Sequence, residues 1–72
     1  MDLKIKNKMN LGTIKDWNHS SGWGFIKGDD GYDYFLNISN VRRGTKVSVG
    51  SRVKFDICHT HKGDEAENVS LI

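Results

Sequence analysis

The strongest limit on the fold of this 72-residue chain is its pattern of short alternating runs, each bounded by turn-forming residues. Helical periodicity is hard to find, and eight glycines are spread along the sequence. Alternation of period two is typical of half-buried β-strands, because successive side chains of a strand point to opposite faces. The runs with this pattern are residues 11–18, 22–27, 33–37, 52–59 and 66–71.

Turn signals separate these runs. Residues 18–21 and 61–64 predict turns, and Asp30-Gly31 suits a tight hairpin that needs positive φ. Residues 39–41 predict a single helical turn. Five short strands in one compact domain point to an all-β fold. The natural candidate is a small five-stranded antiparallel barrel of the oligonucleotide/oligosaccharide-binding (OB) type.

The second run places two aromatic side chains, Trp23 and Phe25, on one face of its strand, with Gly24 between them on the other. Lys15 and Lys27 lie nearby in sequence and would place cations beside the rings. Exposed rings beside lysines can stack unpaired bases and meet their phosphates. Rings on one face of a strand equally suit half of an ordinary core, so both interpretations are open at this point.

Composition narrows the class of protein. The single cysteine excludes an internal disulfide, and no apolar run is long enough to span a membrane. Residues 1–8 have no uninterrupted apolar stretch like that of a signal peptide, so we expect a cytoplasmic protein without a membrane partner. This segment is either an extra strand or a loose basic arm before a domain at residues 9–72. The net charge of +2 permits a polyanionic partner without requiring one.

Cys58, His59 and His61 form a cluster of possible metal ligands near the end of the fourth run. A tetrahedral zinc site needs four converging ligands, and Asp64 or Glu65 would have to complete it. Strand alternation puts Cys58 on the opposite face from the two histidines, so we expect no metal and no other cofactor. No nucleophile stands beside a plausible base at a recognisable spacing, and we therefore expect no enzymatic activity.

A set of segments that runs in order through the chain resembles the cold-shock domain family. Residues 21–26, Ser-Gly-Trp-Gly-Phe-Ile, resemble the family's first ribonucleoprotein-type motif, Lys-Gly-Phe-Gly-Phe-Ile. Residues 34–38, Tyr-Phe-Leu-Asn-Ile, resemble its second motif, Val-Phe-Val-His-Phe. The likeness extends from about residue 9 to residue 72 with consistent spacing. The other matching segments are residues 12–18, 29–31, 49–55 and 66–69.

The resemblance implies a five-stranded barrel that binds single-stranded RNA and DNA and acts as an RNA chaperone or a regulator of gene expression. We expect it to be monomeric. Trp17 aligns with an aromatic that contributes less than its neighbours, and Asn18 aligns with an Asn expected to be structural. The expected contacts to nucleic acid are Lys15, Trp17, Trp23, Phe25, Lys27, Phe35, Asn37, Arg42 and Arg43.

Several positions depart from the family pattern. Asp16 stands where the family has its platform Trp, and Asn37 and Ile38 replace the His and Phe of the second motif. Ser21 replaces the Lys before the first Gly, and the loop at residues 42–50 is shortened and lacks the family's aromatic. Each lost stacking partner removes about 1–3 kcal/mol of possible binding free energy. Two functions are therefore open: a single-strand-binding module of low sequence specificity, and a barrel with weakened nucleic-acid binding that serves as a protein-interaction module.

Overall fold

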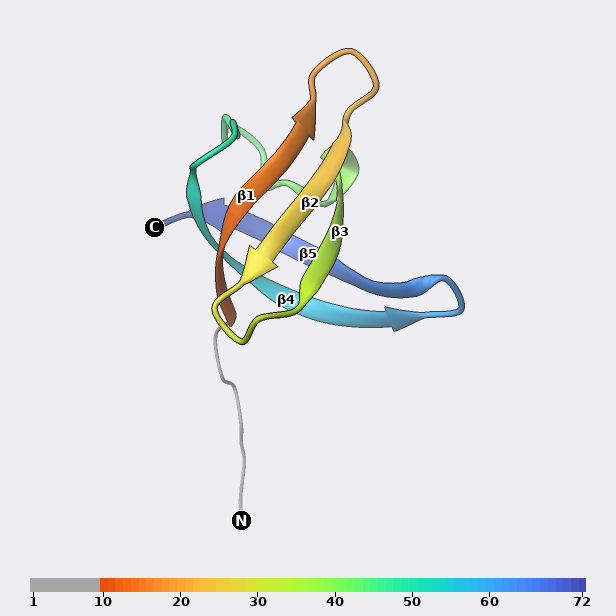
Figure 1. The fold of residues 1–72 in the computed structure, drawn as a ribbon. Coiled ribbons are helices and arrows are strands. Elements are labelled where there is room, and N and C mark those ends of the chain that lie inside the picture. Colours follow the sequence, from red (N-terminus) through yellow and green to blue (C-terminus); the bar gives the residue numbers. More distant parts are fainter. Residues whose placement is uncertain (1–9) are drawn as a thin grey trace.

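The computed structural model describes residues 10–72, so the prediction of an extra strand or arm at residues 1–8 lies outside the described residues. The strands close into a barrel in the order β1-β2-β3-β5-β4, as Figure 1 shows, and the predicted five-stranded OB-type barrel is confirmed. No helix in this described part is long and apolar enough to cross a membrane. The elements are β1 (Asn10–Asn18), β2 (Trp23–Gly28), β3 (Asp33–Asn37), the 3₁₀ turn η2 (Ile38–Asn40), β4 (Arg52–Thr60) and β5 (Gly63–Leu71).

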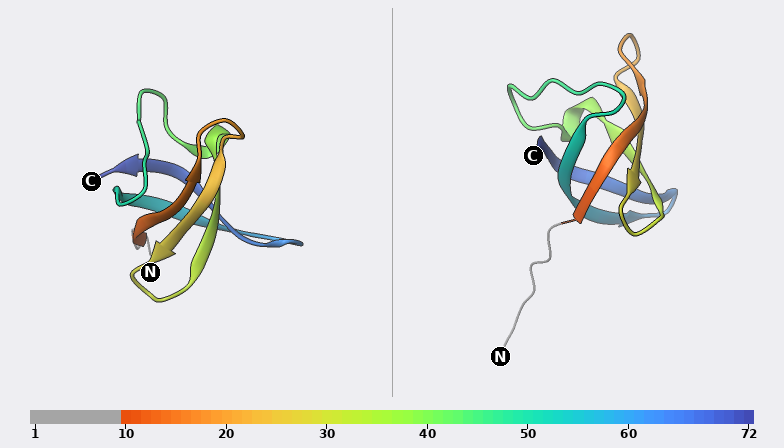
Figure 2. Two further views of the ribbon diagram at one scale, coloured as in Figure 1. Left: turned by 45° about the horizontal axis from the view of Figure 1, so that its top comes forward. Right: turned by 60° about the vertical axis from the view of Figure 1, so that its left-hand side comes forward.

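The barrel is a three-stranded meander closed by a long hairpin. Strands β1, β2 and β3 pair antiparallel in sequence order, and β4 pairs antiparallel with both β1 and β5. The remaining contact, β3 with β5, is parallel, with Phe35 opposite Glu65. The far end of the β4–β5 hairpin projects beyond the barrel wall in Figures 1 and 2.

The core follows from strand alternation. Inward positions of β2 and β3 hold buried apolar side chains, whereas the outward Trp23 and Phe25 lie outside the core cluster. The interpretation of these two rings as ordinary core is therefore wrong. One core residue, Val47, comes from the loop between η2 and β4, and the sequence pattern did not identify it. The core consists of Ile14, Ile26, Tyr34, Leu36, Val47, Val53, Phe55, Ala66 and Val69.

Several predicted boundaries differ from the observed ones by one residue, and the start of β5 differs by more. Strand β5 begins at Gly63 rather than at residue 66, because the hairpin turn is tighter than expected. The Thr60 hydroxyl donates to the Gly63 carbonyl over 2.6 Å and accepts from the Lys62 amide over 3.1 Å, which closes the turn. The 3₁₀ turn η2 begins one residue earlier than predicted, at Ile38.

Irregular backbone in the β2–β3 loop, in β1 and in β5 bears on how the strands pair. Gly31 has a φ of 93° in the β2–β3 loop, as the Asp30-Gly31 signal predicted. In β1, the pairing passes from Ile14 opposite Ile26 to Asp16 opposite Phe25, so Lys15 is the extra residue of a bulge. In β5, Asn68 has a φ of 53° where the pairing with β4 shifts register. Asn is one of the few residues that adopt this left-handed conformation readily.

Candidate functional site

Three aromatic rings lie in mutual contact on the outer face of β2 and β3. The Trp23 and Phe35 rings are stacked, with centroids 6.2 Å apart and planes inclined at 27°. Phe25 meets both edge-on, with its ring centroid 6.2 Å from that of Trp23 and 5.7 Å from that of Phe35. Trp23 remains 41% exposed. These rings, called the platform below, form a continuous apolar surface that faces solvent rather than the core.

The bulge in β1 brings a carboxylate onto the same outer face. Opposed residues of an antiparallel pair share a face, so pairing with Phe25 places Asp16 beside the platform. A Cβ at Gly24 would collide with the Asp16 carbonyl group and would lie 2.9 Å from the Trp17 Cα. Gly24 is therefore needed for the close approach of β1. A hollow of about 320 Å³ lies at this place and is lined by Asp16, Trp17, Asn18, Trp23, Gly24 and Phe25.

Both lysines predicted beside the rings meet one carboxylate, that of Asp33. The Lys15 ammonium donates to Asp33 Oδ2 over 2.7 Å, and the Lys27 ammonium lies 3.7 Å from Asp33 Oδ1. The hydrogen bond from Lys15, together with the charge of both lysines, lowers the pKa of Asp33. The same hydrogen bond raises the pKa of Lys15. The ammonium groups of Lys15 and Lys27 are therefore both held at the Asp33 carboxylate in the free protein.

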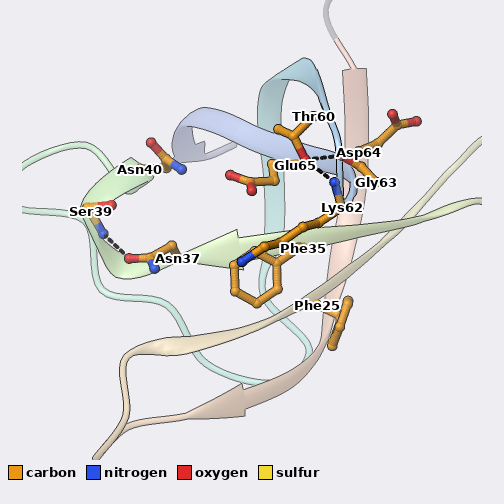
Figure 3. A pocket seen from close by; sticks show the side chains of 10 residues that line it. All are labelled: Phe25, Phe35, Asn37, Ser39, Asn40, Thr60, Lys62, Gly63, Asp64 and Glu65. Carbon is orange, nitrogen blue, oxygen red and sulfur yellow. Dashed lines mark hydrogen bonds between the residues drawn. The ribbon is translucent and has the colours of Figure 1, made fainter.

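The platform continues into a groove of about 510 Å³ that runs toward the β4–β5 hairpin. In Figure 3, Phe25 and Phe35 form one side of this groove, and residues of the hairpin form the other. Asn37 lines it too, and its side-chain oxygen accepts a hydrogen bond from the Ser39 amide over 3.0 Å. The groove is lined by Phe25, Phe35, Asn37, Ser39, Asn40, Thr60, Lys62, Gly63, Asp64 and Glu65.

The remaining predicted contacts lie apart from the groove. Trp17 pairs with Gly24 and packs partly against the core, so only part of its ring borders the Asp16 hollow. Arg42 lines a different hollow with Lys54, and Arg43 is exposed in the loop that follows η2. The structure thus brings the three platform rings, the two lysines and Asn37 together. It leaves Trp17 partly, and both arginines fully, outside this group.

Asn18 has the structural role that its position suggested. Its side-chain oxygen accepts from the Ser21 amide and from the Ser20 hydroxyl, each over 3.0 Å. These bonds close the loop between β1 and β2, which holds Trp23 at the start of its strand. An Asn side chain that accepts from a backbone amide a few residues ahead is a common way to fix a turn.

Seven groove residues were not among the predicted contacts, and the charged ones among them are Lys62, Asp64 and Glu65. Their segment reads as a turn, and only the pairing of β3 with β5 brings Glu65 beside Phe35. Asp33 was missed for a related reason, since its contact with Lys15 crosses β2 from β3 to β1. The one signal for Asp33 in the sequence was its charge, which is opposite to that of Lys27, its partner across the β2–β3 hairpin.

The side chains of Cys58, His59 and His61 do not converge on a common point that could hold a metal ion. Within residues 10–72, no group of three or more His, Cys, Asp or Glu side chains is arranged to hold a metal ion. His59 Nδ1 lies 2.5 Å from Asp64 Oδ1, and His61 lies in the hairpin turn. The hydrogen bond to Glu67 is the main reason that the pKa of the Cys58 thiol is raised, and a raised pKa disfavours the thiolate that binds metals.

Comparisons with known proteins agree with this geometry. The family described as "'Cold-shock' DNA-binding domain" matches residues 10–72. Cold shock protein 1 of Lactiplantibacillus plantarum is 40% identical over 63 residues, which cover 85% of this chain and 96% of that protein. Cold shock-like protein CspC of Bacillus cereus is 37% identical over 60 residues, covering 81% of this chain and 92% of the relative. The solved structure of Drosophila Unr CSD456 superposes with a TM-score of 0.76 at 18% identity, over 90% of this chain and 27% of that one. This last likeness concerns the fold alone.

Proposed function

The chain belongs to the cold-shock domain family, whose members bind nucleic acid and are not enzymes, and from this premise we propose that it binds single-stranded RNA and DNA. The observation that carries the proposal is the exposed platform of Trp23, Phe25 and Phe35. Every base has a π-face, so stacking on aromatic rings binds single strands with low sequence specificity. In a duplex these faces are already covered by neighbouring base pairs.

The cations around the platform supply the second part of the proposal. Lys15 and Lys27 exchange the Asp33 carboxylate for backbone phosphates when a strand lies over the rings. Arg42 and Arg43 meet the strand only where it extends beyond the platform, because they lie outside the groove. Contacts of this kind make affinity fall with salt, by about 0.7 in the slope of log K for each phosphate contacted on a single strand.

In the cell, such a protein would act as an RNA chaperone or as a regulator of transcription and translation, working in the cytoplasm as a monomer. Trapping unpaired bases shifts an RNA equilibrium from hairpin toward open strand, by mass action. An RNA hairpin carrying a fluorophore and a quencher at its ends should therefore brighten as protein is added.

The binding proposal is tested by comparing two aromatic truncations. Phe25→Ala removes a platform ring, whereas Tyr32→Ala removes an aromatic that is 69% exposed in the β2–β3 loop and outside the groove. Affinity for an oligothymidylate should fall by about 1–3 kcal/mol in the first variant and stay near the parent value in the second. Equal effects of the two truncations, in variants that melt like the parent, would refute stacking on the platform.

A second function, a protein-interaction module, is favoured by one observation. Carboxylates of Asp16, Asp33, Asp64 and Glu65 surround the rings, and they would oppose phosphate while attracting a basic peptide. This alternative predicts that a poly-lysine peptide binds the platform more tightly than a single strand does. The stacking proposal predicts that the single strand binds more tightly than the peptide.

A further inference from the structure

Glu65 lines the groove, but base stacking of low sequence specificity gives its carboxylate no role. It lies directly opposite Phe35 in the parallel pair of β3 and β5, and both side chains line the groove. In Figure 3 the Glu65 carboxylate points toward the side of the groove that carries Asn40, and the Phe35 ring borders the same groove. A base stacked on Phe35 would therefore present an edge to this carboxylate.

Two of the other polar side chains that line the groove are engaged within the hairpin. Asp64 pairs with His59 over 2.5 Å, and the Thr60 hydroxyl both donates and accepts within the hairpin turn. Within residues 10–72, the Glu65 carboxylate makes no hydrogen bond and no ion pair. It is the carboxylate in the groove that stays available to a ligand.

Asn37 adds a donor on the same groove. Its side-chain oxygen accepts from the Ser39 amide, which fixes the orientation of the amide group and leaves its NH₂ as the free end. The groove thus offers an acceptor with two oxygens from Glu65 and a donor from Asn37. A base that matches must carry two adjacent donors and a neighbouring acceptor on one edge.

Guanine has that edge, and the other bases do not. Its N1–H and N2–H₂ groups can donate to the two oxygens of one carboxylate, while O6 accepts from an amide NH₂. Thymine and uracil have one N–H between two carbonyl oxygens, which a carboxylate repels. Cytosine and adenine have one amino donor next to a ring nitrogen that only accepts. Hydrogen bonds to a charged acceptor are the stronger kind, so the match is selective.

We propose that Glu65, assisted by Asn37, selects guanine for the base stacked on Phe35. The inference rests on the proposed single-strand function and adds one selective position to a site that otherwise accepts any base. The proposal concerns the base on Phe35 alone, and the bases on Trp23 and Phe25 are bound by stacking.

The test compares an oligothymidylate with the same strand carrying one central guanine, by quenching of tryptophan fluorescence at fixed salt. The guanine strand should bind about fivefold more tightly or better, the factor expected for one bidentate base contact. Replacing that guanine by inosine removes the N2 amino group alone and should cost most of the gain. This comparison uses the unaltered protein, so folding of a variant does not enter.

Two variants assign the effect to its residue. Glu65→Gln keeps the shape and removes the charge, and the guanine-to-thymine affinity ratio should fall to less than about twofold. Glu67→Gln removes the same charge from the same strand outside the groove, and the ratio should stay at the parent value.

Equal affinity of the parent for the two strands would overturn the proposal, and a ratio that survives Glu65→Gln would overturn the assignment to Glu65. In both cases the strands still bind, so single-strand recognition stands. Absence of quenching by any single strand would overturn the proposed function, and this inference with it.

Discussion

Two carboxylates on the outer face of the barrel, Asp16 and Asp33, act differently on a strand that lies across the rings. Asp33 is bonded to Lys15 and lies near Lys27, so two cations share its one carboxylate in the free protein. Asp16 makes no ion pair among the described residues, and it stands opposite Phe25 and lines the hollow beside the platform. We therefore expect the first to withhold cations from a bound strand and the second to repel the strand's phosphates.

Replacement of Asp16 should tighten binding. Asp16→Trp places a ring over the hollow beside Trp23 and Phe25 and should gain about 1–3 kcal/mol for an oligothymidylate. Asp16→Asn removes the charge alone and should gain less, mostly at low salt, because screening weakens the repulsion. Fluorescence titrations of both variants measure this. An Asp16→Trp protein that melts like the parent and binds no better would show that position 16 does not face the ligand.

Asp33→Asn should release both lysines for phosphate. We expect affinity for single strands to rise by about two- to fivefold at low salt, the range typical of an exposed ion pair, and the gain to fade as salt is added. Asp29→Asn is the matched control, since it removes the same charge from a carboxylate that is bonded instead to Arg52. If both variants gain equally, the effect is one of net charge and the lysine contacts have no part in it.

At the scale of single elements, the bulge in β5 depends on the conformation of Asn68. A φ of 53° costs a β-branched residue about 1–2 kcal/mol, whereas Gly adopts it freely. Both Asn68→Val and Asn68→Gly lose the 2.8 Å bond to Asp56. Asn68→Val should therefore lower the free energy of unfolding in urea by about that strain in addition to the lost bond, and Asn68→Gly should lower it less. A Gly variant less stable than the Val variant would contradict the assigned strain.

The β2–β3 loop is tied to the core by one phenol. The Tyr34 hydroxyl donates to Asp30 over 2.5 Å, and this bond, with burial, raises the pKa of Tyr34 from 10.0 to about 12. Folding therefore favours the protonated phenol. Its contribution to stability is complete below pH 10 and is lost as the pH rises toward 12.

Tyr34→Phe should remove this alkaline loss and lower stability at neutral pH by about 1 kcal/mol, the usual value of one hydrogen bond. Denaturant midpoints measured across that pH range test the expectation. Tyr32→Phe serves as the control, since this residue is 69% exposed in the same loop. A Tyr34→Phe protein that still loses stability over the same range would assign the loss to another group.

The sequence predicted the strands because alternation is a local property. All five runs became strands, and parity placed Trp23 and Phe25 on one shared face, although it left open whether that face was the core or the surface. The bulge at Lys15 and the early start of β5 could not be predicted in this way. Both depend on how a strand meets its neighbour, and no short window of sequence contains that information.

At the scale of the whole molecule, the predicted part of the site is the part that depends on local sequence, and the part that was missed depends on how distant strands meet. The rings of the platform come from two adjacent motifs, so their identity was predictable from the resemblance. The groove was not, because it needs β5 beside β3 and brings together segments 30 residues apart, Phe35 and Glu65. Val47 reaches the core from a loop whose charges pointed only to solvent, and barrel closure is what buries it.

The central claim, that the platform stacks bases already out of a helix, is tested most directly with Trp23 as the lone fluorophore. Trp17→Phe leaves Trp23 as the only tryptophan, and the variant is titrated with an oligonucleotide alone and annealed to its complement. The single strand should quench Trp23 to saturation, and the duplex should bind about tenfold more weakly or worse, since opening one base-pair step costs about 1.4 kcal/mol. Equal affinity of Trp23 for the two forms would contradict the stacking account.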